Sequence, residues 1–344
     1  MLLSELTALR GASGCEDEVC AALRAEAERI LGDEGRVFTD TIGNLFACRP
    51  AREPGKKRVM LCAHMDEVGF IIRFATEDGL LRFSCVGGVD PRVIASRRVL
   101  VGENRVPGVI GFKAVHLMTD GEEKKAPDYD MLSIDVGAST KEEAERLCPP
   151  GSYATFDTAF MELGDGFVMG KALDDRVGCF VLLRVLREST YPGELCCVFT
   201  VQVEVGTRGA RVAARRIQPD VALILEGTTA NDMGDVPVDR QVARCGDGAV
   251  ISLMDRSAIM DAQLRALAKE TAKRRGIPAQ DKRAVAGGTD AGPIHTSCGG
   301  VPCLTMAAPC RYIHSPASLC RLSDIDALGA LTLALLEEIG GNPA

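Results

Sequence analysis

A run of apolar residues at 58–64 (RVMLCAH) constrains the fold more than any other feature of the sequence. Apolar side chains fill every position from Val59 to Ala63, so neither face of a strand formed here could meet water. Strands of this kind belong to sheets that carry helices on both faces. Apolar residues recur at helical spacing in 171–188, and the segments 260–275 and 323–339 also predict helices.

Strands and helices alternate through most of the chain. The apolar patterns at 195–205 and 221–226 predict further strands, and a short helix rich in Arg and Ala is expected after Gly209. The segment 15–31 predicts a helix that begins with a capping box at 13–16 (SGCE). This alternation predicts an α/β fold with a mixed sheet flanked by helices.

The middle of the chain breaks this rhythm. Short alternating segments punctuated by Gly, Pro and Asp predict a mostly β domain inserted into the α/β domain, and a charged loop lies within it at 120–130. We expect residues 1–69 and 161–344 to form one discontinuous domain and residues 70–160 the insertion. The expected strands of the insertion include 70–74, 80–86, 97–102 and 107–112.

Composition excludes several classes of protein. A net charge of −8 argues against general binding to nucleic acids or anionic membranes, and the absence of Trp leaves few stacking surfaces for sugars or bases. No signal peptide and no apolar run of about 20 residues is apparent. The 14 Cys include no CxxC pair and are expected to be free thiols in a reducing cytoplasm.

Candidate metal ligands lie where predicted strands end and where a helix begins. Ligands gather outside the carboxyl ends of strands in open α/β sheets, so these side chains are expected to meet. Each also has a structural explanation, as a polar strand end or a helix cap, and spacing alone leaves that alternative open. The candidates are His64, Asp66, Asp174, Asp175, Glu204, Glu226 and His314.

Five motifs occur in order along the chain: AHMDEVGF (63–70), GKALDDRVGC (170–179), VEVGTRGA (203–210), GGTDAGPIH (287–295) and RYIHSP (311–316). Together they resemble the TET aminopeptidase family. Its members are co-catalytic metallopeptidases, also described as glutamyl or deblocking aminopeptidases and sometimes labelled cellulases or endoglucanases. The resemblance spans nearly the whole chain and implies a zinc-peptidase-like catalytic domain with an inserted β domain.

The resemblance implies a site for two divalent metal ions, which are usually zinc, cobalt or manganese. Asp66 would orient His64, and the family more often has Asp where this chain has Glu226. The loop of Gly287, Gly288, Thr289 and Asp290 would contact substrate, although a tight turn is the competing interpretation. In the implied ligand set Asp174 bridges both ions, His64 and Glu226 bind one, and Glu204 and His314 bind the other.

The resemblance also implies a second Glu directly before Glu204, which acts as the general base. This chain has Val203 at that position, and a valine cannot accept a proton. Positioned acid–base groups typically contribute roughly 10²–10⁴-fold to rate. Val203 is expected to extend the apolar face of its strand, so that the change costs the fold nothing.

Three other acids could in principle replace the base, and we expect none of them to do so. Asp175 is expected to pair with Arg176 or Arg208. Glu67 is expected to contact a metal-ligating residue and not the metal itself. Asp232, just past the strand of Glu226, is the third.

Three functions follow from these features. The first is a metal-dependent aminopeptidase that acts on short peptides and is impaired at Val203. The second is a catalytically silent metal-binding paralogue with a structural or regulatory role, and the third, a glycosidase, is disfavoured by the lack of Trp. The resemblance further implies homo-oligomers, from dimers to a tetrahedral dodecamer, with the inserted domain at the contacts.

Overall fold

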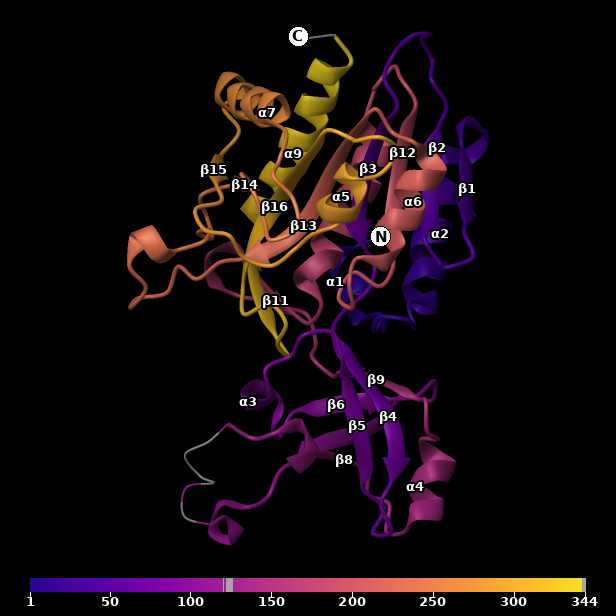
Figure 1. Cartoon of the computed structure of the whole chain (residues 1–344), viewed down its shortest axis with the longest axis vertical. Helices are drawn as coiled ribbons and strands as arrows, with labels where there is room; N and C mark the ends of the chain where they lie inside the picture. Colours follow the sequence, from indigo (N-terminus) through magenta and orange to yellow (C-terminus); the bar gives the residue numbers. More distant parts are fainter. Residues whose placement is uncertain (120, 122–125, 342–344) are drawn as a thin grey trace.

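The computed structural model describes residues 1–119, 121 and 126–341. An α/β body carries both chain ends, and a smaller β body, formed by the middle of the chain, lies below it (Figure 1). The predicted charged loop at 120–130 falls partly outside the described residues.

A mixed sheet runs through the α/β body. Its strands are β1 (Arg36–Thr39), β2 (Leu45–Arg49), β3 (Val59–His64), β10 (Met161–Glu162), β11 (Phe167–Gly170), β12 (Leu195–Thr200), β13 (Val221–Thr229), β14 (Ala249–Ile251), β15 (Ala279–Asp281), β16 (Cys303–Arg311) and β17 (Ser318–Arg321). The main path is β1-β2-β12-β3-β13-β16-β17-β11-β10, with β14 and β15 branching from β16. The four central strands, β12, β3, β13 and β16, are parallel. All six residues of β3 are buried, as its apolar run requires.

Helices cover both faces of this sheet. They are α1 (Leu3–Ala8), α2 (Asp17–Leu31), α5 (Leu173–Glu188), α6 (Arg208–Ile217), α7 (Ala262–Arg275), α8 (Ala291–His295) and α9 (Leu322–Ile339). One layer is built around α5, which packs on β3 and β13 and contacts α1, α2 and α9, while α6 and α8 contact each other on the opposite face. The predicted fold class, a mixed sheet flanked by helices, is confirmed. No helix in the described part of the chain is long and apolar enough to cross a membrane.

The β body is a closed barrel. Its elements are β4 (Gly69–Ala75), β5 (Leu81–Val86), α3 (Pro91–Ile94), β6 (Arg98–Val101), β7 (Val106–Gly111), β8 (Ser133–Asp135), α4 (Lys141–Leu147) and β9 (Tyr153–Phe156). The strands close in the order β4-β5-β8-β7-β6-β9, which leaves the barrel without an open edge. Phe70 packs edge-on against Phe83 and Phe156, with ring centres 5.0 and 5.3 Å away, in a core separate from that of the sheet. The barrel confirms an inserted β domain; its proposed limits and its role in assembly stay predictions.

Two local predictions are wrong. The strand expected at 195–205 ends at Thr200, because Gln202 takes a φ of 57° and the chain turns there. Val203 therefore lies in a turn and extends no strand face. The capping box at 13–16 does not form: Ser13 donates its hydroxyl to Asp66 at 2.5 Å, and α2 begins after Glu16 without a side-chain cap.

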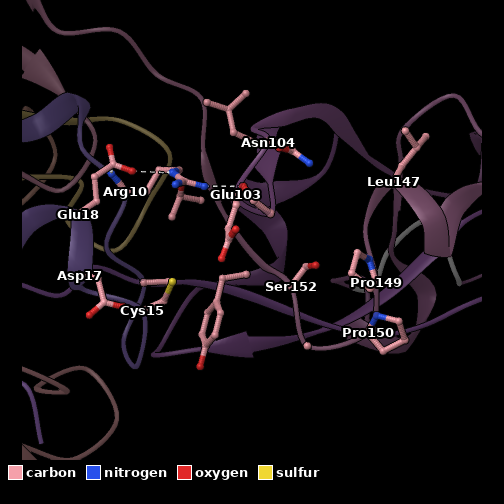
Figure 2. A pocket seen from close by; sticks show the side chains of 16 residues that line it. Arg10, Cys15, Asp17, Glu18, Glu103, Asn104, Leu147, Pro149, Pro150 and Ser152 are labelled. Carbon is pink, nitrogen blue, oxygen red and sulfur yellow. Dashed lines mark hydrogen bonds and ion pairs between the residues drawn. The ribbon is translucent and has the colours of Figure 1, made fainter. Parts of the chain in front are cut away.

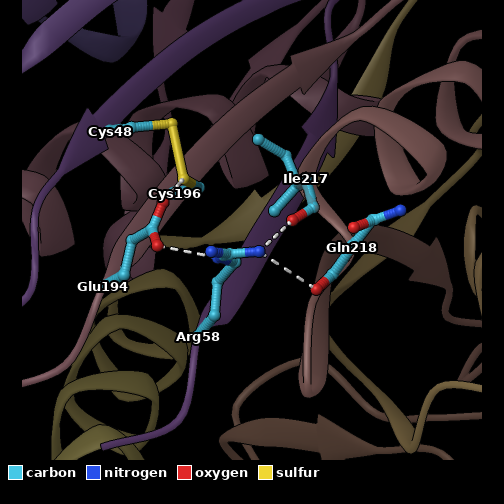
Figure 3. The surroundings of a disulfide bond; sticks show 6 residues. All are labelled: Cys48, Arg58, Glu194, Cys196, Ile217 and Gln218. Atoms are coloured by element: carbon cyan, nitrogen blue, oxygen red, sulfur yellow. Dashed lines mark hydrogen bonds and ion pairs between the residues drawn. A yellow bond between two sulfur atoms is a disulfide. The ribbon is translucent and has the colours of Figure 1, made fainter. Parts of the chain in front are cut away.

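A disulfide bond joins Cys48 of β2 to Cys196 of β12 (Figure 3). The two residues face each other directly in an antiparallel pair, although 148 positions separate them in the sequence. The other twelve cysteines, all within the described residues, are free. The expectation of free thiols throughout is thus wrong for this pair, because strand register is not visible in the sequence. The cytoplasmic location, which was expected because no signal peptide is apparent, stays a prediction.

We predict that Cys196→Ala lowers the free energy of unfolding by about 2–4 kcal/mol, because the cross-link no longer restricts the unfolded chain. Urea unfolding without reductant measures the loss. Cys197→Ala, which removes a buried free thiol from the next position, is the control and should cost less. Titration of 14 thiols in denaturant without reductant, in place of 12, would contradict the disulfide.

Candidate metal centre

Five side chains that the sequence singled out line one cavity of about 590 Å³. The parallel strands β12, β3 and β13 lie side by side, so the segments at their carboxyl ends reach the same edge of the sheet. The five are His64 at the end of β3, Asp174 in the first turn of α5, Glu204 in the turn after β12, Glu226 in β13 and His314 in the hairpin between β16 and β17.

The Asp174 carboxylate lies between the two imidazoles. Its Oδ1 is 3.4 Å from His64 Nε2, and its Oδ2 is 3.6 Å from His314 Nε2. Each imidazole has a second carboxylate nearby: Glu226 Oε2 lies 3.5 Å from His64 Nε2, and Glu204 Oε1 lies 3.2 Å from His314 Nε2. The cluster thus consists of two halves that share Asp174.

Gly227 permits the close approach of α5 to β13. A Cβ atom at this position would lie 3.0 Å from the Asp174 Cα and 3.1 Å from its Cβ, which is tighter than most packed contacts allow. The peptide bond between Asp174 and Asp175 is cis. Because of the short distances to Asp174, a side chain on residue 227 would push Asp174 away from the centre of the cluster.

Backbone carbonyls orient both imidazoles. His64 Nδ1 is 3.0 Å from the carbonyl oxygen of Asp66, closer than the Asp66 carboxylate at 3.5 Å. His314 Nδ1 is 2.9 Å from the carbonyl oxygen of Gly88, in the segment that follows β5 of the barrel. Asp66 thus orients His64 mainly through its backbone, and the inserted domain reaches into the cluster.

Two buried carboxylates hold the turn that carries Val203 and Glu204. Asp66 accepts the backbone N–H groups of both residues at 3.0 Å. Glu16 accepts the N–H of Gln202 at 3.1 Å. The backbone N–H groups of Gln202, Val203 and Glu204 are therefore all held by carboxylates. These hydrogen bonds fix the backbone and so the direction in which the Glu204 side chain points.

The burial and the close spacing of these ionisable groups shift their pKa values. Burial opposes the charged form of His314, but Asp174 and Glu204 outweigh it and raise its pKa to about 11. Burial raises the pKa of Glu226 to about 7. Although burial also opposes ionisation of Asp174, the two imidazoles lower its pKa. In the protein alone, His314 is therefore protonated at neutral pH, and Glu226 binds a proton more readily than an exposed glutamate does.

The donors fit divalent cations. Asp174 Oδ1 is buried and accepts no hydrogen bond from the residues that the structure describes. Donor atoms of His64, Asp174 and Glu204 lie within 4.8 Å of one another, and so do those of His64, Asp175 and Glu226. Imidazole nitrogens and carboxylate oxygens without a thiolate suit zinc, cobalt or manganese.

Comparison with known proteins points the same way. The sequence matches the family described as M42 glutamyl aminopeptidase over residues 43–331. The chain belongs to the M42 family. A putative aminopeptidase of Acetivibrio thermocellus is 39% identical over 94% of both chains. The lysyl aminopeptidase of Pyrococcus furiosus is 31% identical over 98% of this chain and 96% of its own.

A solved structure extends the similarity to the whole fold. The Pyrococcus horikoshii TET1 peptidase, which can assemble into a tetrahedron or a large octahedral shell, superposes with a TM-score of 0.84. It is 33% identical, and 97% of each chain is covered. The resemblance to the TET aminopeptidase family, which the five sequence motifs indicated, is therefore confirmed.

Asp175 is not paired as expected. Its carboxylate accepts the backbone N–H groups of His64 at 3.1 Å and Gly178 at 2.9 Å. No Arg of the described residues forms an ion pair with it, so the expected partners Arg176 and Arg208 are wrong. Burial raises its pKa well above the ordinary range.

The other two acids are held by cations. Glu67 Oε1 lies 2.7 Å from Lys171 Nζ and 3.4 Å from Arg176. The bidentate ion pair of Asp232 with Arg311 has distances of 2.7 and 2.8 Å. Neither residue lines the cavity.

The predicted substrate loop divides between surface and interior. Gly287, Gly288 and Thr289 line the cavity. Asp290 does not: it is buried and accepts the hydroxyl of Thr200 at 2.6 Å.

Sequence reasoning missed three contributors to the site: Glu16, the Gly88 carbonyl and Lys282, which lines the cavity. Glu16 looked like part of a capping box, and no motif marks a carbonyl. Lys282 lies five residues before Gly287, and its short distance from that motif was the available signal.

A larger cavity of about 890 Å³ lies elsewhere, between the segment around Cys15 and the barrel (Figure 2). Arg10 crosses it to Glu18, with 2.9 Å between Nε and Oε2. None of the five clustered side chains lines it. The chemistry therefore belongs to the smaller cavity.

We predict that Glu16→Gln removes a pH dependence of stability. Burial raises the pKa of Glu16 from 4.5 to about 7, so the folded protein keeps a proton that the unfolded chain has lost. The contribution of Glu16 to the free energy of unfolding should therefore fall as pH rises from about 4.5 to about 7, by at most about 3 kcal/mol.

Urea unfolding at pH 5 and pH 8 measures this change. The Gln variant, which keeps an acceptor for the turn, should match the wild type at pH 5 and exceed it at pH 8. Asp17→Asn, at the exposed next position, should leave the wild-type slope intact. Equal slopes in wild type and Glu16→Gln would show that Glu16 does not titrate in this window.

Proposed function

We propose that this M42 chain is a metal-dependent aminopeptidase that removes N-terminal residues from short peptides, with catalysis impaired at Val203. The observation that carries the proposal is the Asp174 carboxylate, whose two oxygens lie between two imidazoles that are each backed by a further carboxylate. Family membership and the relatives named as aminopeptidases support the reaction class.

The proposed ligand set follows the two halves of the cluster. Asp174 would be shared by two divalent ions, His64 and Glu226 would hold one, and Glu204 and His314 the other. Such a pair of zinc, cobalt or manganese ions supplies a polarised carbonyl and an acidified water. Asp66 supports the set by orienting His64 and fixing the backbone of Glu204.

The impairment is supported by what lines the cavity. Val203 lies on its wall, and the carboxylates that the described residues place there are Asp174, Glu204 and Glu226, all assigned to metal. On this proposal, the described lining offers no carboxylate outside the ligand set to take a proton from the attacking water and deliver it to the leaving amine. A catalytically silent metal-binding paralogue is the second candidate, and Val203 is the observation that favours it.

We further propose a homo-oligomer, between a dimer and a dodecamer, with the barrel at the contacts. The assembly of the Pyrococcus horikoshii peptidase into closed shells supports this proposal. The partners of the assembled protein would be short peptides. Its net charge of −8 favours neither nucleic acid nor anionic membranes.

We predict that Val203→Glu raises kcat roughly 10²–10⁴-fold on aminoacyl-p-nitroanilides, because it restores a proton acceptor beside the cluster. Val203→Gln is the matched control: it adds the same bulk and polarity but cannot act as a base. A wild type that turns over substrates, with no gain in the Glu variant, would refute the missing-base argument. No turnover in either protein would favour the silent paralogue.

Metal content tests the ligand set directly. The wild type should bind two divalent ions per chain, and Asp174→Asn should lose both or retain one weakly, because the shared ligand is gone. Elemental analysis after dialysis against zinc, and again after chelation, gives the stoichiometry. Asp165→Asn, on the surface, is the control. Two tightly held ions in Asp174→Asn would exclude a shared role.

A further inference from the structure

Two cysteines face each other at the base of the hairpin that carries His314. Cys310 of β16 and Cys320 of β17 are direct partners in the antiparallel ladder of these strands, and neither has exposed surface. The carbonyl of Cys310 accepts the N–H of Ala230, which follows β13, at 2.7 Å. Because the N–H and C=O of one strand residue point to the same side, Cys310 turns its backbone groups away from β17. The two cysteines therefore form a non-hydrogen-bonded pair.

A pair of this kind has the geometry that a disulfide bond requires. In such pairs the Cα atoms are typically about 4.5 Å apart, and a disulfide spans Cα distances of about 4.4–6.8 Å. Cys48 and Cys196, which are joined, are likewise direct partners in an antiparallel pair. Hydrogen bonding to Cys320, followed by burial, raises the pKa of the Cys310 thiol well above its ordinary value. The two thiols are thus neighbours in the reduced protein.

The hairpin that carries His314 is closed by a short ladder. Two residue pairs join β16 to β17, and the cysteines are one of them. His314 lies beyond both pairs, and its side chain is 38% exposed. The carbonyl of Gly88, in the segment after β5, orients its ring. A covalent bond between the cysteines would restrict the segment that brings His314 into the cluster.

We propose that Cys310 and Cys320 are a site of disulfide formation whose bond fastens His314 in the metal cluster, a role that rests on the proposed ligand set. Oxidised glutathione is a sufficient oxidant. The thiolate of one cysteine attacks its disulfide and releases one glutathione thiolate, and the thiolate of the other cysteine then displaces the second. Each protein disulfide formed thus reduces one glutathione disulfide, and the two cysteine protons end on the two glutathione thiols. Because both cysteines are buried in the folded chain, the exchange takes place while the chain folds.

Cell-free synthesis of the full chain in glutathione buffers of defined ratio tests the bond. Chain made with mostly oxidised glutathione should have two fewer free thiols in denaturant than the 12 of the structure. Peptide mapping by mass spectrometry should recover Cys310 linked to Cys320. Cys303→Ala, which removes another buried thiol from β16, is the control and should keep the bond.

Two results would overturn the proposed bond. One is a chain that forms the Cys48–Cys196 bond in this buffer and leaves Cys310 and Cys320 as free thiols. The other is a bond from either residue to Cys245, the half-buried thiol whose Sγ lies 3.4 Å from the carbonyl oxygen of Pro309.

Zinc affinity tests the consequence in a Cys196→Ala parent, where the first disulfide cannot form. The more weakly held of two zinc ions should bind roughly 10-fold more tightly to the oxidised parent than to the reduced parent, on the scale of a contact that supports a metal ligand. Competition with a chelator measures both affinities. Cys320→Ala in this parent should bind zinc like the reduced parent in either buffer, which separates loss of the bond from damage to the fold.

The outcomes separate this role from the proposed ligand set. A mapped bond with equal zinc affinities in the oxidised and reduced parent would overturn the fastening of His314 and leave the ligand set standing. A parent that binds fewer than two zinc ions in both forms would refute the ligand set, and the role of the bond with it, whatever the peptide map shows.

Discussion

The buried carboxylate of Asp66 is the contact on which the shape of the site depends. It has no exposed surface, and it accepts the Ser13 hydroxyl and the backbone N–H groups of Val203 and Glu204. Three segments that are distant in the sequence therefore meet on one side chain: the end of β3, the approach to α2 and the turn after β12. Burial of such a carboxylate is tolerated because these donors replace its water shell. Together with Glu16, this anchor fixes the backbone from which Glu204 projects toward the cluster.

The two halves of the cluster are built from different parts of the chain. His64 and Glu226 lie on neighbouring parallel strands, and the His64 side chain is 2% exposed. The side chain of His314 is 38% exposed and is oriented by Gly88, which leaves the barrel. Gly87 has a φ of +85°, and a Cβ there would lie 3.1 Å from the Cβ of Glu204. One half of the cluster therefore depends on the backbone of the segment that follows β5 of the barrel.

How far the sequence predicts this structure depends on the type of interaction. The apolar run at 59–63 predicts a strand that is buried on both faces, because every side chain in the run is apolar whichever face it points to. The alternation of Val201, Val203 and Val205 is equally regular, yet it crosses a turn, since a period of two cannot reveal the positive φ of Gln202. The bond between Cys48 and Cys196 depends on register, which a linear pattern does not contain.

The backbone contacts that shape the turn around Val203 do not depend on the side chain at that position. Asp66 and Glu16 hold the turn through backbone N–H groups, and these contacts do not involve the side chain at 203. A glutamate and a valine can therefore occupy the same turn without moving Glu204 or the imidazoles. On the proposed function, the change would leave the backbone hydrogen bonds of the turn intact and remove only proton transfer. The geometry of the cluster therefore indicates which ions the site could bind, and it does not give the rate at which the site acts.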